Sequence, residues 1–226
     1  MTVTHAFLSF AAVAGLLTVI PGLDTAIVLR TALAQGRARA FATGAGIGTG
    51  GLIWGIAAAT GVSVLLTASH TAYLALRVVG AAYLIWMGGR MLLDALRRKD
   101  TAAPATTAAA ATTAAATSAA GPGTGRRGIA RAWSRGLTTN LLNPKIGVFY
   151  VAMLPQFIPA GAPHLLMGAA LALVHDVEGM IWFTAIIFTA HTARGLFAGG
   201  TVKRAMDALT GSVLVGFGLK LAASRG

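Results

Sequence analysis

The sequence predicts an all-α integral membrane protein of about six transmembrane helices, built as two inverted three-helix repeats in which helices 1 and 4 are broken. Of its 226 residues, 56% are hydrophobic and only 11% are charged, whereas soluble domains carry about 25% charged residues. The mean hydropathy is +0.73. A soluble fold of this composition would expose an extensive apolar surface, which a lipid bilayer accommodates instead.

Six apolar runs are long enough to cross the hydrocarbon core as helices, which takes about 20 residues. They cover residues 6–29, 41–66, 73–94, 136–158, 164–190 and 205–222. Residues 97–131 are rich in Ala and Thr and carry no apolar stripe. This segment predicts a flexible linker between an N-terminal half, residues 1–96, and a C-terminal half, residues 132–226. A partly helical surface segment is the alternative interpretation.

Lys and Arg residues occur in the first, third and fifth connectors between these runs and are absent from the second and fourth. Because cytoplasmic connectors carry the excess of Lys and Arg, the pattern predicts a cytoplasmic central linker and both termini outside. Most of the basic residues behind the net charge of +12 therefore lie in membrane connectors. It does not indicate the basic face of a nucleic-acid-binding domain.

Two of the predicted helices contain a break at equivalent places in the two halves. Helix 1 carries the run Pro21-Gly22-Leu23-Asp24-Thr25, and helix 4 carries Asn143-Pro144-Lys145. Each proline lies nine residues from an arginine, Arg30 or Arg135, which is ~14 Å along a helix and near the middle of a ~30 Å hydrocarbon core. Matched interruptions in two halves are the best sequence indication of a transporter binding site.

Each break carries one ionisable residue at membrane depth, where charges are costly and usually functional. Asp24 follows the first break and Lys145 follows the second. An amino acid is a zwitterion, so its ammonium group favours a nearby anion and its carboxylate favours a cation or a helix N-terminus. The pair therefore indicates an amino-acid site. A purely structural ion pair between the two halves is the alternative.

Helix 5 carries a second group of ionisable residues near its middle, His175, Asp176 and Glu178. The helical period places His175 and Glu178 on one face, with Asp176 about 100° away. Such groups suit proton coupling, because burial in the membrane favours the neutral form of a carboxyl group. A polar interior face of the helix and a divalent-cation site are the alternatives.

The remaining motifs argue for packing rather than catalysis. Gly46 and Gly50 form a small-xxx-small pair in helix 2, which predicts a close approach of helices. The small-residue faces of helices 2 and 6 would permit a homodimer. The chain has no cysteine and no HExxH or GxSxG motif, so we expect neither an enzyme nor a bound cofactor or metal.

Three stretches together resemble the LysE/RhtB translocators, the lysine and homoserine/threonine exporters. They are PGLDTAIVLRTALAQGRARAFATGAGIGTG, GAAYLIWMGGRMLL and RGLTTNLLNPKIGVFYVAMLPQFI. The resemblance covers nearly the whole chain except about residues 100–125. It implies efflux of amino acids or related metabolites driven by the proton gradient. It also implies functional roles for six residues: Pro21, Gly22, Asp24, Asn143, Pro144 and Lys145.

The sequence departs from the family pattern at three positions. Leu23 stands where a second proline is usual, Thr31 replaces a common Asn, and Trp54 occupies a position often taken by His. The acidic group on helix 5 matches no family motif. These departures bear on the identity of the substrate rather than on the transport role.

The interpretation that combines these features is a secondary transporter of a bacterial inner membrane that exports small amino acids by proton antiport with alternating access. Its expected partners are the amino acid, protons and membrane lipid. The expected substrate-binding residues are Pro21, Gly22, Asp24, Thr25, Asn143, Pro144 and Lys145. The expected proton-coupling residues are Asp24, His175, Asp176 and Glu178. A divalent metal cation exporter on the same scaffold is the alternative function.

Overall fold

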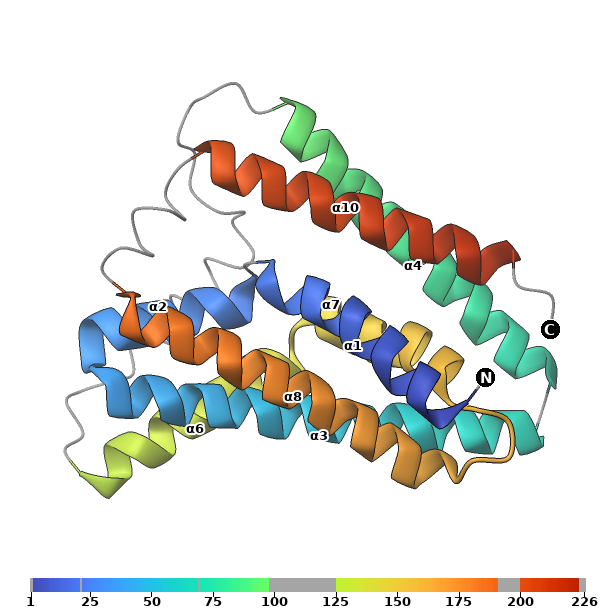
Figure 1. The fold of residues 1–226 in the computed structure, drawn as a ribbon, viewed down its shortest axis with the longest axis horizontal. Helices are drawn as coiled ribbons and strands as arrows, with labels where there is room; N and C mark the ends of the chain where they lie inside the picture. The colour runs from blue at the N-terminus through green and yellow to red at the C-terminus, as the bar shows by residue number, and fades with distance from the viewer. Residues whose placement is uncertain (1, 21, 69, 98–124, 191–199, 224–226) are drawn as a thin grey trace.

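The computed structural model describes residues 2–20, 22–68, 70–97, 125–190 and 200–223, and every regular element in these ranges is a helix (Figure 1). The α-helices are α1 (Val3–Val19), α2 (Leu23–Gln35), α3 (Arg37–Ala68), α4 (His70–Arg97), α6 (Arg126–Leu141), α7 (Pro144–Val148), α8 (His164–Phe188) and α10 (Gly200–Ala223). Between α7 and α8 lie a π-helical turn, η1 (Phe149–Met153), and a 3₁₀ turn, η2 (Leu154–Phe157).

The elements follow the predicted order, and both predicted breaks are present. Helix 1 is divided into α1 and α2, and helix 4 is divided into α6 and α7. Helix limits agree with the prediction within six residues, with one exception. The fourth helix begins at Arg126, ten residues earlier than predicted, so the end of the predicted flexible linker is helical. Residues 98–124 of that linker lie outside the described residues.

The early start of α6 has a physical cause that hydropathy does not detect. Its first turns are rich in arginine, but Gly128, Ala132, Gly136 and Asn140 recur every four residues and are buried. A spacing of four residues forms one stripe along a helix. This stripe packs against α3, so the helix continues beyond its apolar part.

Within the described ranges, three helices are long and apolar enough to cross a membrane, namely α3, α4 and α8. A fourth span arises if α1 and α2, whose axes differ by 54°, count as one bent helix. Large apolar side chains such as Leu173 and Ile181 on α8 are exposed. The all-α membrane class is therefore supported, and the count of spans by length and composition is three or four.

Glycines let α3 and α6 approach each other closely. A Cβ atom on Gly46 would overlap the carbonyl group of Trp133 in α6, and one on Gly136 would overlap the carbonyl group of Thr43 in α3. The two helices therefore touch backbone to backbone at both positions, which is possible only for residues without side chains. The predicted packing role of Gly46 is confirmed.

The helices α4 and α10 run side by side as a pair (Figure 1). A Cβ atom on Gly88 would lie 2.6 Å from the carbonyl oxygen of Gly211, and the reverse distance is also 2.6 Å. Gly218 faces Ile85 of α4 in the same way. Small-residue faces of helices 2 and 6 thus pack inside the chain. The homodimer that these faces would permit stays an expectation.

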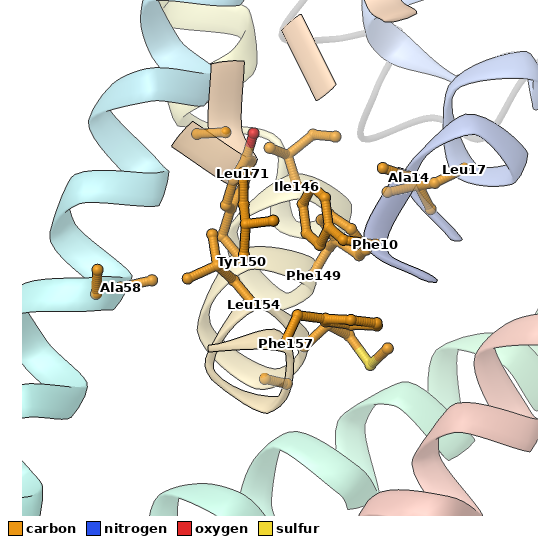
Figure 2. Packing of buried hydrophobic residues seen from close by; sticks show 14 of the residues in the cluster. Phe10, Ala14, Leu17, Ala58, Ile146, Phe149, Tyr150, Leu154, Phe157 and Leu171 are labelled. Carbon is orange, nitrogen blue, oxygen red and sulfur yellow. The ribbon is translucent and has the colours of Figure 1, made fainter. Parts of the chain in front are cut away.

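Aromatic side chains fix the second broken helix against α1. The ring of Phe10 lies 5.8 Å from that of Phe149 in η1 and 5.4 Å from that of Phe157 in η2. Figure 2 shows these rings together with Tyr150, which is fully buried. Tilted and edge-to-face rings at these distances attract one another beyond their burial. This cluster positions the site described next.

Candidate functional site

The carbonyl groups at the end of α1 are bound by the lysine of the other break. Residue 20 leaves the helix with an extended backbone, and a helix end leaves carbonyl groups without helical partners. The Lys145 ammonium group donates to the carbonyl oxygens of Leu17 and Ile20 at 3.2 and 3.4 Å. The lysine itself is held in the first turn of α7, where the Asn143 side chain caps its backbone N–H at 3.2 Å.

Asp24 lies in the first turn of α2 and is only 9% exposed. The Asn140 side-chain amide of α6 donates to its Oδ2 atom at 3.0 Å. The Lys145 ammonium group attracts the same carboxylate electrostatically. An acidic group from one half and a basic group from the other therefore lie in the same interior region, as the sequence predicted.

The two breaks and helix 5 line one cavity of about 60 Å³, which is room for a few water molecules. Six of the predicted site residues contribute to its wall: Gly22, Asp24, Asn143, Lys145, His175 and Asp176.

The other predicted site residues lie elsewhere. Pro144 lines a second, apolar pocket together with Trp54 and Tyr83. Thr25 is buried outside the cavity wall. Glu178 faces Gly15 of α1, where an added Cβ would lie 3.5 Å from its Oε1 atom. Pro21 lies outside the described residues.

On helix 5, Asp176 rather than Glu178 joins His175 at the cavity. The Asp176 carboxylate packs on two glycines of α3. A Cβ atom added to Gly51 would lie 2.6 Å from the Oδ1 atom of Asp176, and one added to Gly48 would lie 3.7 Å from the same atom. His175 Nδ1 shares a hydrogen bond of 3.0 Å with the hydroxyl of Tyr150. The helical period places His175 and Glu178 on one face of α8, but it does not show which residues lie where α3 crosses this helix.

Unpartnered acceptor atoms give the cavity its chemical character. In the described part of the chain, Asp24 Oδ1, Asn140 Oδ1 and Asp176 Oδ2 are buried without a hydrogen-bond partner, and all three residues line the cavity. Buried oxygens of this kind need a donor, and an ammonium group offers three. No group of three or more His, Cys, Asp or Glu residues suited to a metal ion occurs among the described residues.

A comparison with known families identifies the chain. The pattern of the LysE type translocator family matches residues 3–225. The chain belongs to the LysE type translocator family. This confirms the resemblance found in the three sequence stretches.

Several relatives of this LysE type translocator match over nearly their whole length. The leucine efflux protein of Klebsiella pneumoniae is 28% identical over 220 residues, which cover 96% of this chain and 94% of the relative. The threonine efflux protein of Escherichia coli K12 is 27% identical over 226 residues, covering 97% and 98%. The uncharacterized membrane protein YrhP of Bacillus subtilis is 26% identical over 216 residues, covering 96% and 98%. No solved structure matches the chain.

Two polar residues of this translocator's cavity were missed from the sequence. The Asn140 side chain donates to Asp24 and lies three residues before the second break. A polar residue one turn before Asn143 was the feature of the sequence that could have identified it. Tyr150 contacts His175 from the π-helical turn η1. It sits in an otherwise apolar run, and no spacing rule pairs it with helix 5.

Replacing Tyr150 by Phe in the LysE type translocator tests this contact. Removing the hydroxyl leaves His175 Nδ1 without this hydrogen bond, which costs about 1 kcal/mol of folding stability. We expect the midpoint of thermal unfolding in detergent to fall by about 2–4 °C. As a control, Tyr83→Phe removes the same group from α4, where the ring packs on Trp86 at 5.5 Å. An equal fall in both variants would contradict the assignment.

Proposed function

We propose that this protein is a six-span secondary transporter that exports amino acids across the bacterial cytoplasmic membrane by proton antiport with alternating access. The observation that carries the proposal is the cavity at the two helix breaks, where Asp24 and Lys145 supply opposite charges. Relatives named for leucine efflux and threonine efflux support an amino-acid substrate. Transport rather than catalysis is the role that these relatives favour.

The ammonium group of the substrate would bind at the acidic side of the cavity. Asp24 Oδ1 is a buried acceptor there, with no hydrogen-bond partner among the described residues, whereas Asn140 Oδ1 packs on α3, where a Cβ added to Gly50 would lie 2.6 Å from it. A charge-assisted hydrogen bond from an ammonium group to a buried carboxylate is among the strongest available to a protein. Asp176 Oδ2 provides a further acceptor across the cavity.

The carboxylate of the substrate would bind where Lys145 meets the start of α2. The N-cap of α2 is Gly22, which has no side chain to cap the first N–H groups of the helix. An added Cβ on Gly22 would lie 3.7 Å from the Lys145 ammonium nitrogen. Helix N-termini favour anions. The start of α7 is less suitable because the Asn143 side chain already caps it.

The helix contacts support two inverted repeats. In chain order, α3 is helix 2 and α8 is helix 5, while α1 and α6 are the first parts of the broken helices 1 and 4. Exchanging helices 1, 2 and 3 with helices 4, 5 and 6 therefore turns the contact of α3 with α6 into the contact of α8 with α1. The contacts of α3 with α8 and of α4 with α10 are unchanged by this exchange. Such repeats allow alternating access by rocking one half against the other around a central site.

The arginine positions support the proposed orientation. The turn from α2 to α3, the beginning of α6 and the end of α8 lie at the left end of the molecule in Figure 1, opposite the N-terminus. Arg37 stacks on Phe188 there at 4.8 Å, and Arg126 and Arg127 begin α6. Basic residues gathered at one end suit the cytoplasmic side, with the N-terminus outside.

Proton coupling would use Asp176 and His175 beside the substrate site, with Asp24 as a second candidate. Asp176 lines the same cavity as Asp24, so a proton on one carboxyl group would weaken the attraction of the cavity for an ammonium group. This competition is a simple physical basis for exchange of substrate against protons. Glu178 remains a candidate on the α1 side.

The test is uptake of a labelled amino-acid panel into liposomes that contain the purified protein. With an acidic lumen, outward proton flow should drive alanine, leucine or threonine into the vesicles above their external concentration. A protonophore should abolish this accumulation, and protein-free liposomes provide the baseline. Absence of amino-acid uptake in vesicles that do transport Mn²⁺ would contradict the proposal and favour the metal-cation exporter.

A further inference from the structure

The cavity changes from polar to apolar along its length, and two helices show the same gradient. On α8, residues 176, 180 and 183 share one face, and they are Asp176, Met180 and Phe183. On α3, Gly51 and Gly48 lie beside the Asp176 carboxylate, whereas Gly44 lies beside Met180 and Phe183. All of these residues line the cavity, so one end offers charge and the other offers only apolar contacts.

Gly44 sets the size of the apolar end. An added Cβ at this position would lie 3.3 Å from Cδ2 of Phe183 and 3.6 Å from Cε of Met180. Ile47, one turn away on α3, completes this part of the wall and packs with Phe183 in a buried cluster. The cluster also contains Ile27 of α2, one turn after Asp24, so the apolar end begins directly beside the acidic group.

We propose that the apolar end formed by Ile47, Met180 and Phe183 binds the substrate side chain and selects uncharged aliphatic amino acids. The inference rests on the proposed function, because Asp24 and Lys145 must first hold the ammonium and carboxylate groups. An aliphatic side chain then replaces water against apolar walls. A lysine or arginine side chain would have to bury its charge against the apolar side chains of Ile47, Met180 and Phe183, which is unfavourable.

The specificity of transport tests the assignment. Gly44→Ala adds one methyl group at the apolar end and should lower the kcat/KM for leucine at least about tenfold relative to alanine. Phe183→Ala and Met180→Ala enlarge the same space and should raise the kcat/KM for phenylalanine relative to alanine by a similar factor. Gly216→Ala is the matched control, because Gly216 is an exposed glycine of α10 with no atom within 4 Å of an added Cβ.

The outcomes separate this inference from the proposed function. If the unchanged protein moves amino acids but transports lysine as well as leucine, the inference is wrong and the function stands. The same holds if none of the three variants alters the ratio of leucine or phenylalanine to alanine. If one enlarging variant does not fold, the other still decides. If the unchanged protein moves no amino acid, both proposals fail.

Discussion

Replacing Asp24 by Asn is expected to lower amino-acid export by about 100-fold, while the protein still folds. The substitution preserves the size of the side chain and its contact with Asn140, but it removes the negative charge from a buried site. Losing one partner of a buried, hydrogen-bonded charge pair across a binding interface costs about 2–5 kcal/mol of binding free energy, and every 1.4 kcal/mol corresponds to about tenfold in binding. The measurement is the initial rate of proton-driven amino-acid uptake into reconstituted liposomes under a fixed pH gradient.

The matched control is Asp94→Asn, which makes the same chemical change at an exposed position of α4. This variant should transport at the rate of the unchanged protein. Equal, proton-coupled transport by Asp24→Asn would rule out Asp24 as the ammonium ligand and as a required proton site. If the Asp24→Asn variant binds substrate normally but no longer responds to the pH gradient, Asp24 is a proton site and not the ammonium ligand.

Replacing Gly46 by Ala is expected to prevent stable packing of α3 on α6. The added methyl group overlaps the backbone carbonyl group of Trp133 and lies 2.9 Å from the backbone nitrogen of Leu137. Neither atom can move without displacing α6. Overpacking usually lowers the free energy of unfolding by about 1–3 kcal/mol and occasionally more. We expect a loss at the upper end of this range for Gly46→Ala, because the added methyl group meets rigid backbone. The yield of monodisperse protein in detergent is the measurement, and we expect it to fall several-fold.

The same substitution in α10, Gly216→Ala, provides the comparison because an added Cβ there meets open space. Alanine favours a helix over glycine by about 1 kcal/mol, so this variant should be at least as stable as the unchanged protein. Normal yield and unfolding temperature for Gly46→Ala would show that α3 and α6 are further apart than the structure places them. A loss of yield in both variants would point to a general intolerance of the chain.

The sequence by itself determined the all-α class, the order of the helices and both breaks. These features depend on local properties: apolar run length, proline without a backbone donor and the cost of charge in lipid. It also singled out Asp24 and Lys145 as candidates, because an ionisable residue beside a break is conspicuous in an apolar chain. The start of α6 was misplaced because its first turns are held by a buried stripe rather than by hydropathy.

Only the tertiary structure decided which of these residues meet. Lys145 binds the carbonyl oxygens of Leu17 and Ile20 across 128 and 125 residues of sequence, and Asn140 binds Asp24 across 116. The glycines of α3 set how closely α6 and α8 approach, and so place Asp176 rather than Glu178 in the cavity. Helical spacing gives the relative directions of side chains on one helix, but the crossing of two helices depends on packing at their interface.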